Sequence, residues 1–236
     1  MKNIESKILS EANVETLAMS IYKESKDMGF TSADYVKLMN SILGFSIEKV
    51  TDGMSTLEVP KEMDEVATDF PLKSKNVIIR KYEKTKDEVI LKKWFEDDNS
   101  RLFLLSRTTS EDLVLESLSD DKSNSIGMIT LLDGKPIGVL ALLHIDEKNK
   151  KAEMRKLIGS SQYRGRGLAK EASKLWLAYG TKVLGLNKIY INTLEANISN
   201  ISLNRQLGFK IEGVLKKECI INSQEHDVFR MAYYKE

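Results

Sequence analysis

The sequence predicts an α+β fold, in which a mixed and mostly antiparallel sheet is flanked by helices and follows a small N-terminal helical extension. The N-terminal part repeats apolar residues with helical spacing, whereas strand-like and helix-like runs alternate after residue 76. Two strand-like runs are joined by Asp133-Gly134, a typical hairpin turn. A glycine-containing loop at residues 162–169 stands between a strand and a long helix. Hairpins combined with helices indicate a mixed sheet rather than a regular doubly wound one.

The composition is that of an ordinary globular protein, with 42% apolar and 30% charged residues in a chain of 236. Lys and Arg total 36 and Asp and Glu total 35, so the net charge of +1 predicts neither a nucleic-acid partner nor a membrane partner. The single cysteine, Cys219, excludes an intrachain disulfide and fits a reducing compartment. No apolar run approaches the roughly 18 residues of a membrane helix, so we expect a cytoplasmic protein.

The N-terminal region is expected to be an extension rather than an independent domain. Apolar residues recur with helical spacing over residues 4–28 and again over residues 31–43, and Gly44 is expected to end the second helix. Two helices cannot bury much of a core by themselves. We therefore expect residues 1–72 to be a helical extension and linker that packs on residues 73–236 or on the second subunit of a homodimer.

Strands and helices alternate in the rest of the chain. The expected strands cover residues 77–79, 125–132, 136–145, 152–158, 188–194, 209–218 and 227–234. The expected helices cover residues 86–105, 110–119, 168–184 and 199–207. Gly185 and Gly208 are expected to end the last two helices.

The loop at residues 162–169 carries the main chemical signal. Gly165 and Gly167 let backbone N–H groups approach an anion closely. The N-terminus of the following helix adds free N–H donors and a partial positive charge, and Arg164 and Arg166 add further positive charge. Together these features predict a phosphate site. The alternative is a glycine-rich turn that only joins the strand to the helix.

The spacing of the glycines narrows the choice of phosphate ligand. A dinucleotide fingerprint needs a third glycine where this chain has Lys170, and a nucleoside triphosphate loop needs Gly-Lys followed by Ser or Thr. Neither pattern is present. What remains is Gln-x-x-Gly-x-Gly, formed by Gln162, Gly165 and Gly167.

This remaining pattern resembles the Q/R-x-x-G-x-G/A motif of the GNAT superfamily of N-acetyltransferases. The resemblance covers about residues 76–236 and is closest to the branch of the ribosomal-protein alanine and spermidine acetyltransferases. It is also carried by residues 152–159, by residues 197–209 with their Leu-Gly-Phe ending, and by residues 226–231. It implies the GNAT fold and acetyl-CoA as the co-substrate of an N-acetyltransferase.

The resemblance assigns the acetyl-CoA contacts to the loop and to the strand before it. In this family that strand diverges from its neighbour, so its backbone groups can bind the pantetheine arm and polarise the thioester carbonyl. The loop N–H groups bind the pyrophosphate, and an asparagine farther along helps to hold the cofactor. The residues implied are Leu157, Ile158, Gly159, Gln162, Arg164, Gly165, Arg166, Gly167, Leu168, Ala169 and Asn197.

The implied reaction is direct attack of a neutral amine on the thioester in a ternary complex. Glu153 is the candidate base, acting through water, and the alternative is that it only pairs with Arg155 on the same strand face. Asn204 stands where many relatives have a tyrosine that reprotonates the thiolate. Because an amide is not an acid near neutral pH, Asn204 is expected to hydrogen-bond the sulfur or a water, while water, Tyr190 or Ser202 supplies the proton.

The sequence leaves the acceptor open among an amino sugar, a protein N-terminus and a polyamine or other small amine. Sugar acceptors are common in this branch and are slightly favoured. A polyamine site should be strongly acidic, and none can be assigned. His144 and His226 lack metal-ligand spacing, so no metal is expected. The alternative class is a catalytically weak or inactive CoA-binding regulatory module, which the absence of the tyrosine at Asn204 would explain.

Overall fold

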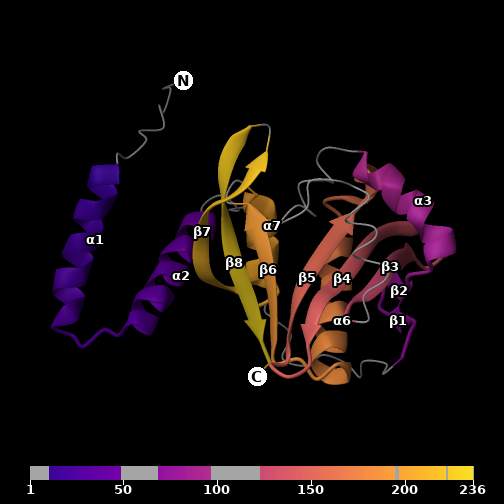
Figure 1. Cartoon of the computed structure of the whole chain (residues 1–236), viewed down its shortest axis with the longest axis horizontal. Helices are drawn as coiled ribbons and strands as arrows, with labels where there is room; N and C mark the ends of the chain where they lie inside the picture. The colour runs from indigo at the N-terminus through magenta and orange to yellow at the C-terminus, as the bar shows by residue number, and fades with distance from the viewer. Residues whose placement is uncertain (1–10, 49–68, 97–122, 195–196, 222, 236) are drawn as a thin grey trace. The chain divides into compact units, whose positions relative to one another are not determined.

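The computed structural model describes residues 11–48, 69–96, 123–194, 197–221 and 223–235 (Figure 1). The chain divides into two compact units, residues 1–52 and residues 53–236. This division falls between described segments, and the predicted boundary at residue 72 stays a prediction. Among the described residues, no helix has the length and apolar character needed to cross a membrane.

The first unit contains helices α1 (Glu11–Lys26) and α2 (Ser32–Glu48), which the helical periodicity predicted. Gly29 follows α1 with a φ of 77°, the left-handed conformation that ends many helices. Tyr35 joins the two helices, because its hydroxyl lies 2.8 Å from Ser25 Oγ and its ring centroid lies 5.9 Å from that of Tyr22.

The prediction that Gly44 ends the second helix was wrong, since α2 continues to Glu48. A glycine ends a helix when it adopts a positive φ, as Gly29 does, and Gly44 is not among the positive-φ glycines of the described residues. Inside a helix a glycine costs only about 1 kcal/mol relative to alanine. That cost is too small to stop the helix at Gly44.

The second unit is built on a single sheet, whose described strands have the order β1-β2-β3-β4-β5-β6-β8-β7. The strands are β1 (Leu72–Lys73), β2 (Val77–Lys81), β3 (Ser125–Leu131), β4 (Pro136–Asp146), β5 (Lys151–Ile158), β6 (Lys188–Leu194), β7 (Lys210–Ile221) and β8 (Gln224–Tyr234). All neighbours pair antiparallel except β5 and β6, which are parallel. The predicted mixed, mostly antiparallel sheet is confirmed, with β1 as an additional short strand.

The described helices of this unit are α3 (Lys84–Phe95), α6 (Leu168–Ala178) and α7 (Ile198–Gln206), with a 3-10 turn, η1 (Ser161–Tyr163). The prediction that the first of these helices reaches residue 105 was wrong, because α3 ends at Phe95. Residues 97–105 and the helix predicted at residues 110–119 lie outside the described residues.

The long helix after the loop also differs from its prediction. Its α-helical part ends at Ala178 and continues as a π-helical turn, η2 (Tyr179–Val183). Gly180 allows close packing here, since a Cβ on it would lie 2.7 Å from Ile189 Cδ1. Gly185 then ends the segment with a φ of 67°, as predicted.

Helices cover both faces of the sheet (Figure 1). On one face Leu91, Trp94 and Phe95 of α3 pack in a cluster with residues of β3, β4 and β5. On the other face Trp176 of α6 lies against Gly127 of β3, where a Cβ would come within 2.8 Å of the indole ring. Because strand side chains alternate between faces, each residue of β5 faces either α3 or the side of α6.

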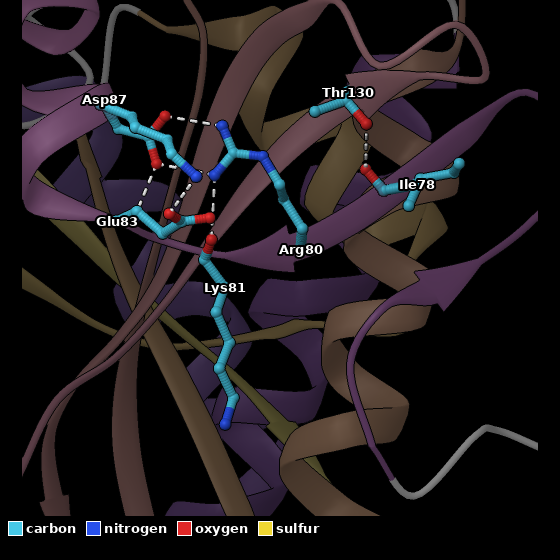
Figure 2. Close-up of polar contacts among 7 residues, drawn as sticks. Ile78, Arg80, Lys81, Glu83, Asp87 and Thr130 are labelled. Carbon is cyan, nitrogen blue, oxygen red and sulfur yellow. Dashed lines mark hydrogen bonds and ion pairs between the residues drawn. The ribbon is translucent and has the colours of Figure 1, made fainter.

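An ion pair fixes α3 to the sheet. The guanidinium of Arg80, on β2, donates to both carboxylate oxygens of Asp87 at 2.7 and 2.6 Å, and the Glu83 N–H donates to the same carboxylate at 2.8 Å (Figure 2). Asp87 is completely buried. Burial opposes ionisation, but the bonds from Arg80 and Glu83 outweigh it and hold the pKa of Asp87 below its ordinary value.

Candidate active site

An opening between β5 and β6 lies at the centre of the sheet. The two strands pair only at Lys151–Lys188, Ala152–Ile189 and Glu153–Tyr190, although β5 continues to Ile158 and β6 to Leu194. Figure 1 shows the two strands diverging beyond this short paired stretch. The backbone edges of residues 154–158 and 191–194 are therefore not bonded to each other across the opening.

The register of β5 decides which backbone groups face this opening. Gly159 N–H donates to Ile137 O of β4 at 3.0 Å, so residues 157 and 159 form hydrogen-bonded pairs with β4. Ile158, whose backbone groups point the other way, faces the opening, and so does Lys156. Of the three strand residues assigned from sequence, Leu157 and Gly159 thus contribute to the β4 ladder, and Ile158 presents its backbone to the opening.

The glycine loop leads from the end of β5 to the N-terminus of α6. Gly165 and Gly167 have φ angles of 74° and 77°, and no atom lies within 4 Å of a Cβ built on either. The glycines are therefore required by backbone conformation rather than by crowding. Gly165, Arg166 and Gly167 are exposed, and α6 begins immediately afterwards at Leu168.

The two arginines of the loop have different surroundings. The Arg164 guanidinium donates to Ile158 O at 2.9 Å and to Gly159 O at 3.2 Å, so this side chain holds the loop against the end of β5. Arg164 therefore brings its positive charge to the loop in a fixed position, because two backbone carbonyls hold the guanidinium. Arg166 is exposed and lies 5.6 Å from the ring centroid of Tyr163. Gln162, the first residue of the motif, is also exposed.

A carboxylate anchors the start of α6. Glu171 accepts hydrogen bonds from Ser74 Oγ at 2.6 Å, Asn76 N–H at 2.7 Å and Asn76 Nδ2 at 2.8 Å. Burial raises the pKa of Glu171, but these bonds outweigh burial and lower it. No local pattern predicts this contact, because Asn76 and Glu171 lie 95 positions apart in the chain.

Helix α7 spans the opening on the face that α6 covers. Asn197 caps this helix by accepting from the Asn200 N–H at 3.2 Å, and Asn200 Nδ2 donates to Thr193 Oγ1 of β6 at 2.9 Å. Toward β5, on the other side of the opening, Asn204 Oδ1 accepts a hydrogen bond from Lys156 Nζ. One helix therefore bridges the two diverging strands.

Lys156 is the residue that the sequence reasoning missed. Burial lowers the pKa of its ammonium to about 7, and no charged group within the described residues contributes to the shift. Its partner Asn204 is completely buried, and Asn204 Nδ2 is one of the few buried polar atoms without a hydrogen-bond partner among the described residues. A lysine between Met154 and Ile158 on an otherwise apolar strand face was the available signal.

Glu153 lies on the other face of β5. It is buried, and its Oε1 accepts from Arg155 Nε at 3.1 Å. Tyr190, directly beside Glu153 in the register of β6, faces the same way, and the Arg230 guanidinium lies 4.9 Å from its ring centroid. Glu153 and Lys156 are thus on opposite faces of the same strand, and the structure brings Asn204 to Lys156 rather than to Glu153.

The fold and the site match one protein family. The family model described as "Acetyltransferase (GNAT) domain" matches residues 76–210. The chain belongs to the GNAT acetyltransferase family and is an acyltransferase.

The relatives agree with the branch expected from sequence. The chain is 32% identical to spermidine N(1)-acetyltransferase of Escherichia coli (strain K12) over 146 residues, which are 62% of this chain and 74% of that protein. It is 27% identical to the putative ribosomal N-acetyltransferase YdaF of Bacillus subtilis (strain 168), over 56% of this chain and 74% of the relative. The crystal structure of Vibrio cholerae spermidine N-acetyltransferase with CoA and spermine is similar in fold, with a TM-score of 0.59, 23% identity, and coverage of 67% of this chain and 95% of that one.

Proposed function

We propose that this protein transfers the acetyl group of acetyl-CoA to a primary amine, by direct attack of the amine in a ternary complex. The observation that carries the proposal is the opening between β5 and β6, which leads to the exposed glycine loop at the start of α6. A long ligand with phosphates at one end and a thioester farther along fits this arrangement, because helix N-termini bind phosphate. The structure of the Vibrio cholerae relative with CoA supports this choice of donor.

In this proposal backbone groups hold most of the cofactor. Ile158 N–H, which faces the opening, binds the pantetheine arm or the thioester carbonyl, and Leu157 and Gly159 fix its position through β4. The N–H groups from Arg164 through Ala169 hold the pyrophosphate, with the exposed side chains of Gln162 and Arg166 beside it. Asn197 contributes by fixing the start of α7.

Glu153 is the proposed base. It lies at the last paired position of β5, where the opening begins, and it faces away from α7. An amine that approaches from this face meets Glu153 on one side and the thioester between the strands. Glu153 would then accept the amine proton through a water molecule while Arg155 compensates its charge.

The described part of this face favours an amino sugar or a peptide N-terminus over a polyamine. A polyamine needs uncompensated carboxylates, and Glu153 is already paired with Arg155 at 3.1 Å. Arg230 adds positive charge nearby, stacked on Tyr190. Hydroxyl or carbonyl groups of an acceptor would be suitable partners for these arginines.

The test is amine-dependent thiol release from acetyl-CoA, measured with amino sugars, a short peptide and spermidine. We expect release with at least one acceptor class and CoA binding in its absence. Tight CoA binding without turnover on any amine would identify a CoA-binding regulatory module instead. Failure to bind CoA would contradict both functions.

The loop itself is tested by Gly165→Val. A side chain with a branched Cβ is strained at a φ of 74°, so the loop must change its conformation and CoA affinity should fall by about 30-fold or more. The matched control is Gly134→Val, a positive-φ glycine in the hairpin turn with equal space around it. The control should lose similar stability but keep its CoA affinity, and equal loss of affinity in both variants would argue against a role of the loop.

A further inference from the structure

We propose that Lys156 donates the proton to the CoA thiolate and that Asn204 holds the Lys156 ammonium in position for this transfer. The inference rests on the proposed function, because it assumes that acetyl-CoA lies in the opening between β5 and β6. It assigns a catalytic role to a strand residue outside the predicted site, and a positioning role to Asn204.

The first argument is location. Lys156 belongs to the part of β5 that no longer pairs with β6, and its backbone groups face the opening. Its Nζ donates to Asn204 of α7, the helix that also contacts β6 through Asn200 and Thr193. The Lys156–Asn204 contact therefore crosses the opening on one face, and a ligand inserted between the strands passes beside it.

The second argument is the unused donor of Asn204. The residue is completely buried, its Oδ1 is occupied by Lys156, and its Nδ2 has no partner within the described residues. The Asn204 carbonyl oxygen accepts from the Leu207 and Phe209 N–H groups, so the backbone at this position is fixed. A buried amide with a free N–H₂ group is costly unless something accepts from it. A thiolate sulfur is such an acceptor, and it would receive hydrogen bonds from Asn204 and Lys156 together.

Burial also brings the proton affinity of Lys156 close to that of a thiol. It lowers the pKa of Lys156 to about 7, whereas a cysteine thiol has a pKa of about 8.5. The Lys156 ammonium can therefore give its proton to the departing thiolate near neutral pH. A lysine with an ordinary pKa of 10.5 would hold its proton too tightly to be an effective acid.

The step balances as follows. The amine nitrogen attacks the thioester carbonyl carbon, the new C–N bond forms, and the C–S bond breaks with its electron pair on sulfur. The attacking nitrogen loses one proton to the base, and the sulfur gains one proton from Lys156 Nζ. Neutral Lys156 recovers a proton from solvent after the thiol leaves.

The two other donors expected from sequence are less well placed. Tyr190 is in register with Glu153, so it lies on the opposite sheet face from Lys156. Ser202 lies on α7 two positions before Asn204, and residues two apart do not share a helix face. Lys156 is the donor that faces α7 across the opening.

The proposal can be tested without knowing the acceptor, by titrating the thiol of bound CoA. The ultraviolet absorbance of the thiolate is followed against pH in complexes of CoA with the full-length protein. Above pH 7 the Lys156 amine is mostly neutral and, together with Asn204, donates hydrogen bonds that stabilise the thiolate. Lys156→Met should therefore raise the thiol pKa of bound CoA by about one unit relative to the wild-type complex, whereas the matched control Lys151→Met, at the exposed start of the same strand, should leave it unchanged.

The outcomes separate the two proposals. If CoA binds but Lys156→Met leaves the thiol pKa unchanged, Lys156 is not beside the sulfur and the inference is overturned, while the proposed function stands. If CoA does not bind to the wild-type protein, both are overturned. Thermal unfolding of each variant shows whether Lys156→Met has kept the fold.

A kinetic comparison distinguishes proton donation from positioning. Lys156→Arg keeps a positive charge and a donor toward Asn204, but a guanidinium does not release its proton near neutral pH. With an active acceptor, kcat should fall about 100-fold in both Lys156→Arg and Lys156→Met, with the KM for acetyl-CoA within about threefold of wild type. Recovery of wild-type kcat in Lys156→Arg would assign Lys156 to positioning alone and overturn its role as the acid.

Discussion

Buried charged side chains on the two faces of the sheet have different kinds of partner. On the face covered by α3, the carboxylates of Asp87 and Glu153 are each paired with an arginine, at 2.6 Å to Arg80 and 3.1 Å to Arg155. On the face covered by α6 and α7, the ammonium of Lys156 contacts the neutral amide of Asn204 and no carboxylate within the described residues. The first arrangement neutralises charge, whereas the second, as far as the described residues go, leaves a cation without a compensating anion.

This difference separates groups that maintain the fold from the group to which we assign a chemical role. A compensated pair keeps both partners ionised, as the lowered pKa of Asp87 shows. An uncompensated lysine has its pKa lowered to about 7, so it can exchange its proton near neutral pH. Perturbed groups of this kind are common at functional sites. Glu153 shares one property with each group. It is paired with an arginine, as Asp87 is, and it borders the opening, as Lys156 does.

The largest expected effect is on stability, at the compensated pair of α3. Asp87→Ala leaves the half-buried Arg80 without its partner, and breaking a buried ion pair costs about 3–5 kcal/mol. Urea unfolding should show this loss. Glu225→Ala serves as the control, since that carboxylate pairs with the exposed Lys217 in the same unit and its removal should cost at most about 1 kcal/mol. Equal losses in the two variants would mean that the Arg80–Asp87 pair does not anchor α3.

The second prediction asks whether Glu153 acts as a base or only as a partner of Arg155. Glu153→Gln should lower kcat by about 100-fold without changing CoA affinity, because the amide cannot accept the amine proton. Arg155→Met breaks the same ion pair and should lower kcat less than about fivefold if Glu153 is the base. Similar losses of kcat in both variants would instead assign Glu153 to the structural pair.

The third prediction concerns the pH dependence of stability caused by Lys156. Its pKa in the folded protein is about 7, below the ordinary 10.5, so between these values the unfolded state binds the extra proton. The free energy of unfolding therefore rises from pH 7 toward pH 10, because Lys156 is then buried as a neutral amine. Below pH 7 it is buried as a cation, and the full cost of burying that charge lowers stability. The stabilising effect of Lys156→Met in urea unfolding should be larger at pH 6.5 than at pH 9.5, by about 3 kcal/mol. A constant difference would show that Lys156 is not desolvated.

Much of the fold was predictable because its signals are local. Hairpin turns, helical spacing and the two loop glycines act over a few residues, and they specified the sheet, most of its strands and the position of the glycine loop between β5 and α6. The failures at Gly44 and at the end of α3 are also local, because a glycine or a polar stretch only weakly marks where a helix ends.

The candidate site was predictable only where residues close in sequence define it. Glu153 and Arg155 share a strand face by their spacing, and their pairing was one of the two alternatives that the sequence left open for Glu153. Lys156 and Asn204 are 48 positions apart, and nothing in the sequence states that α7 crosses the opening to meet β5. The fixed conformation of Arg164 depends in the same way on the carbonyls at the end of β5.

The smallest expected effect concerns Glu171, a carboxylate held by neutral donors instead of an arginine. Glu171→Gln keeps one acceptor for Ser74 Oγ and the Asn76 N–H, loses the acceptor for Asn76 Nδ2, and removes the charge that favours the N-terminus of α6, so it should cost about 1 kcal/mol. The lowered pKa of Glu171 means that this contribution is present above the unfolded pKa and is lost as the pH falls through the folded one. Glu147→Gln, in an exposed turn, should cost nothing measurable. If Glu171→Gln is also silent, the position of the glycine loop does not depend on this charge, and the loop is held mainly by Arg164.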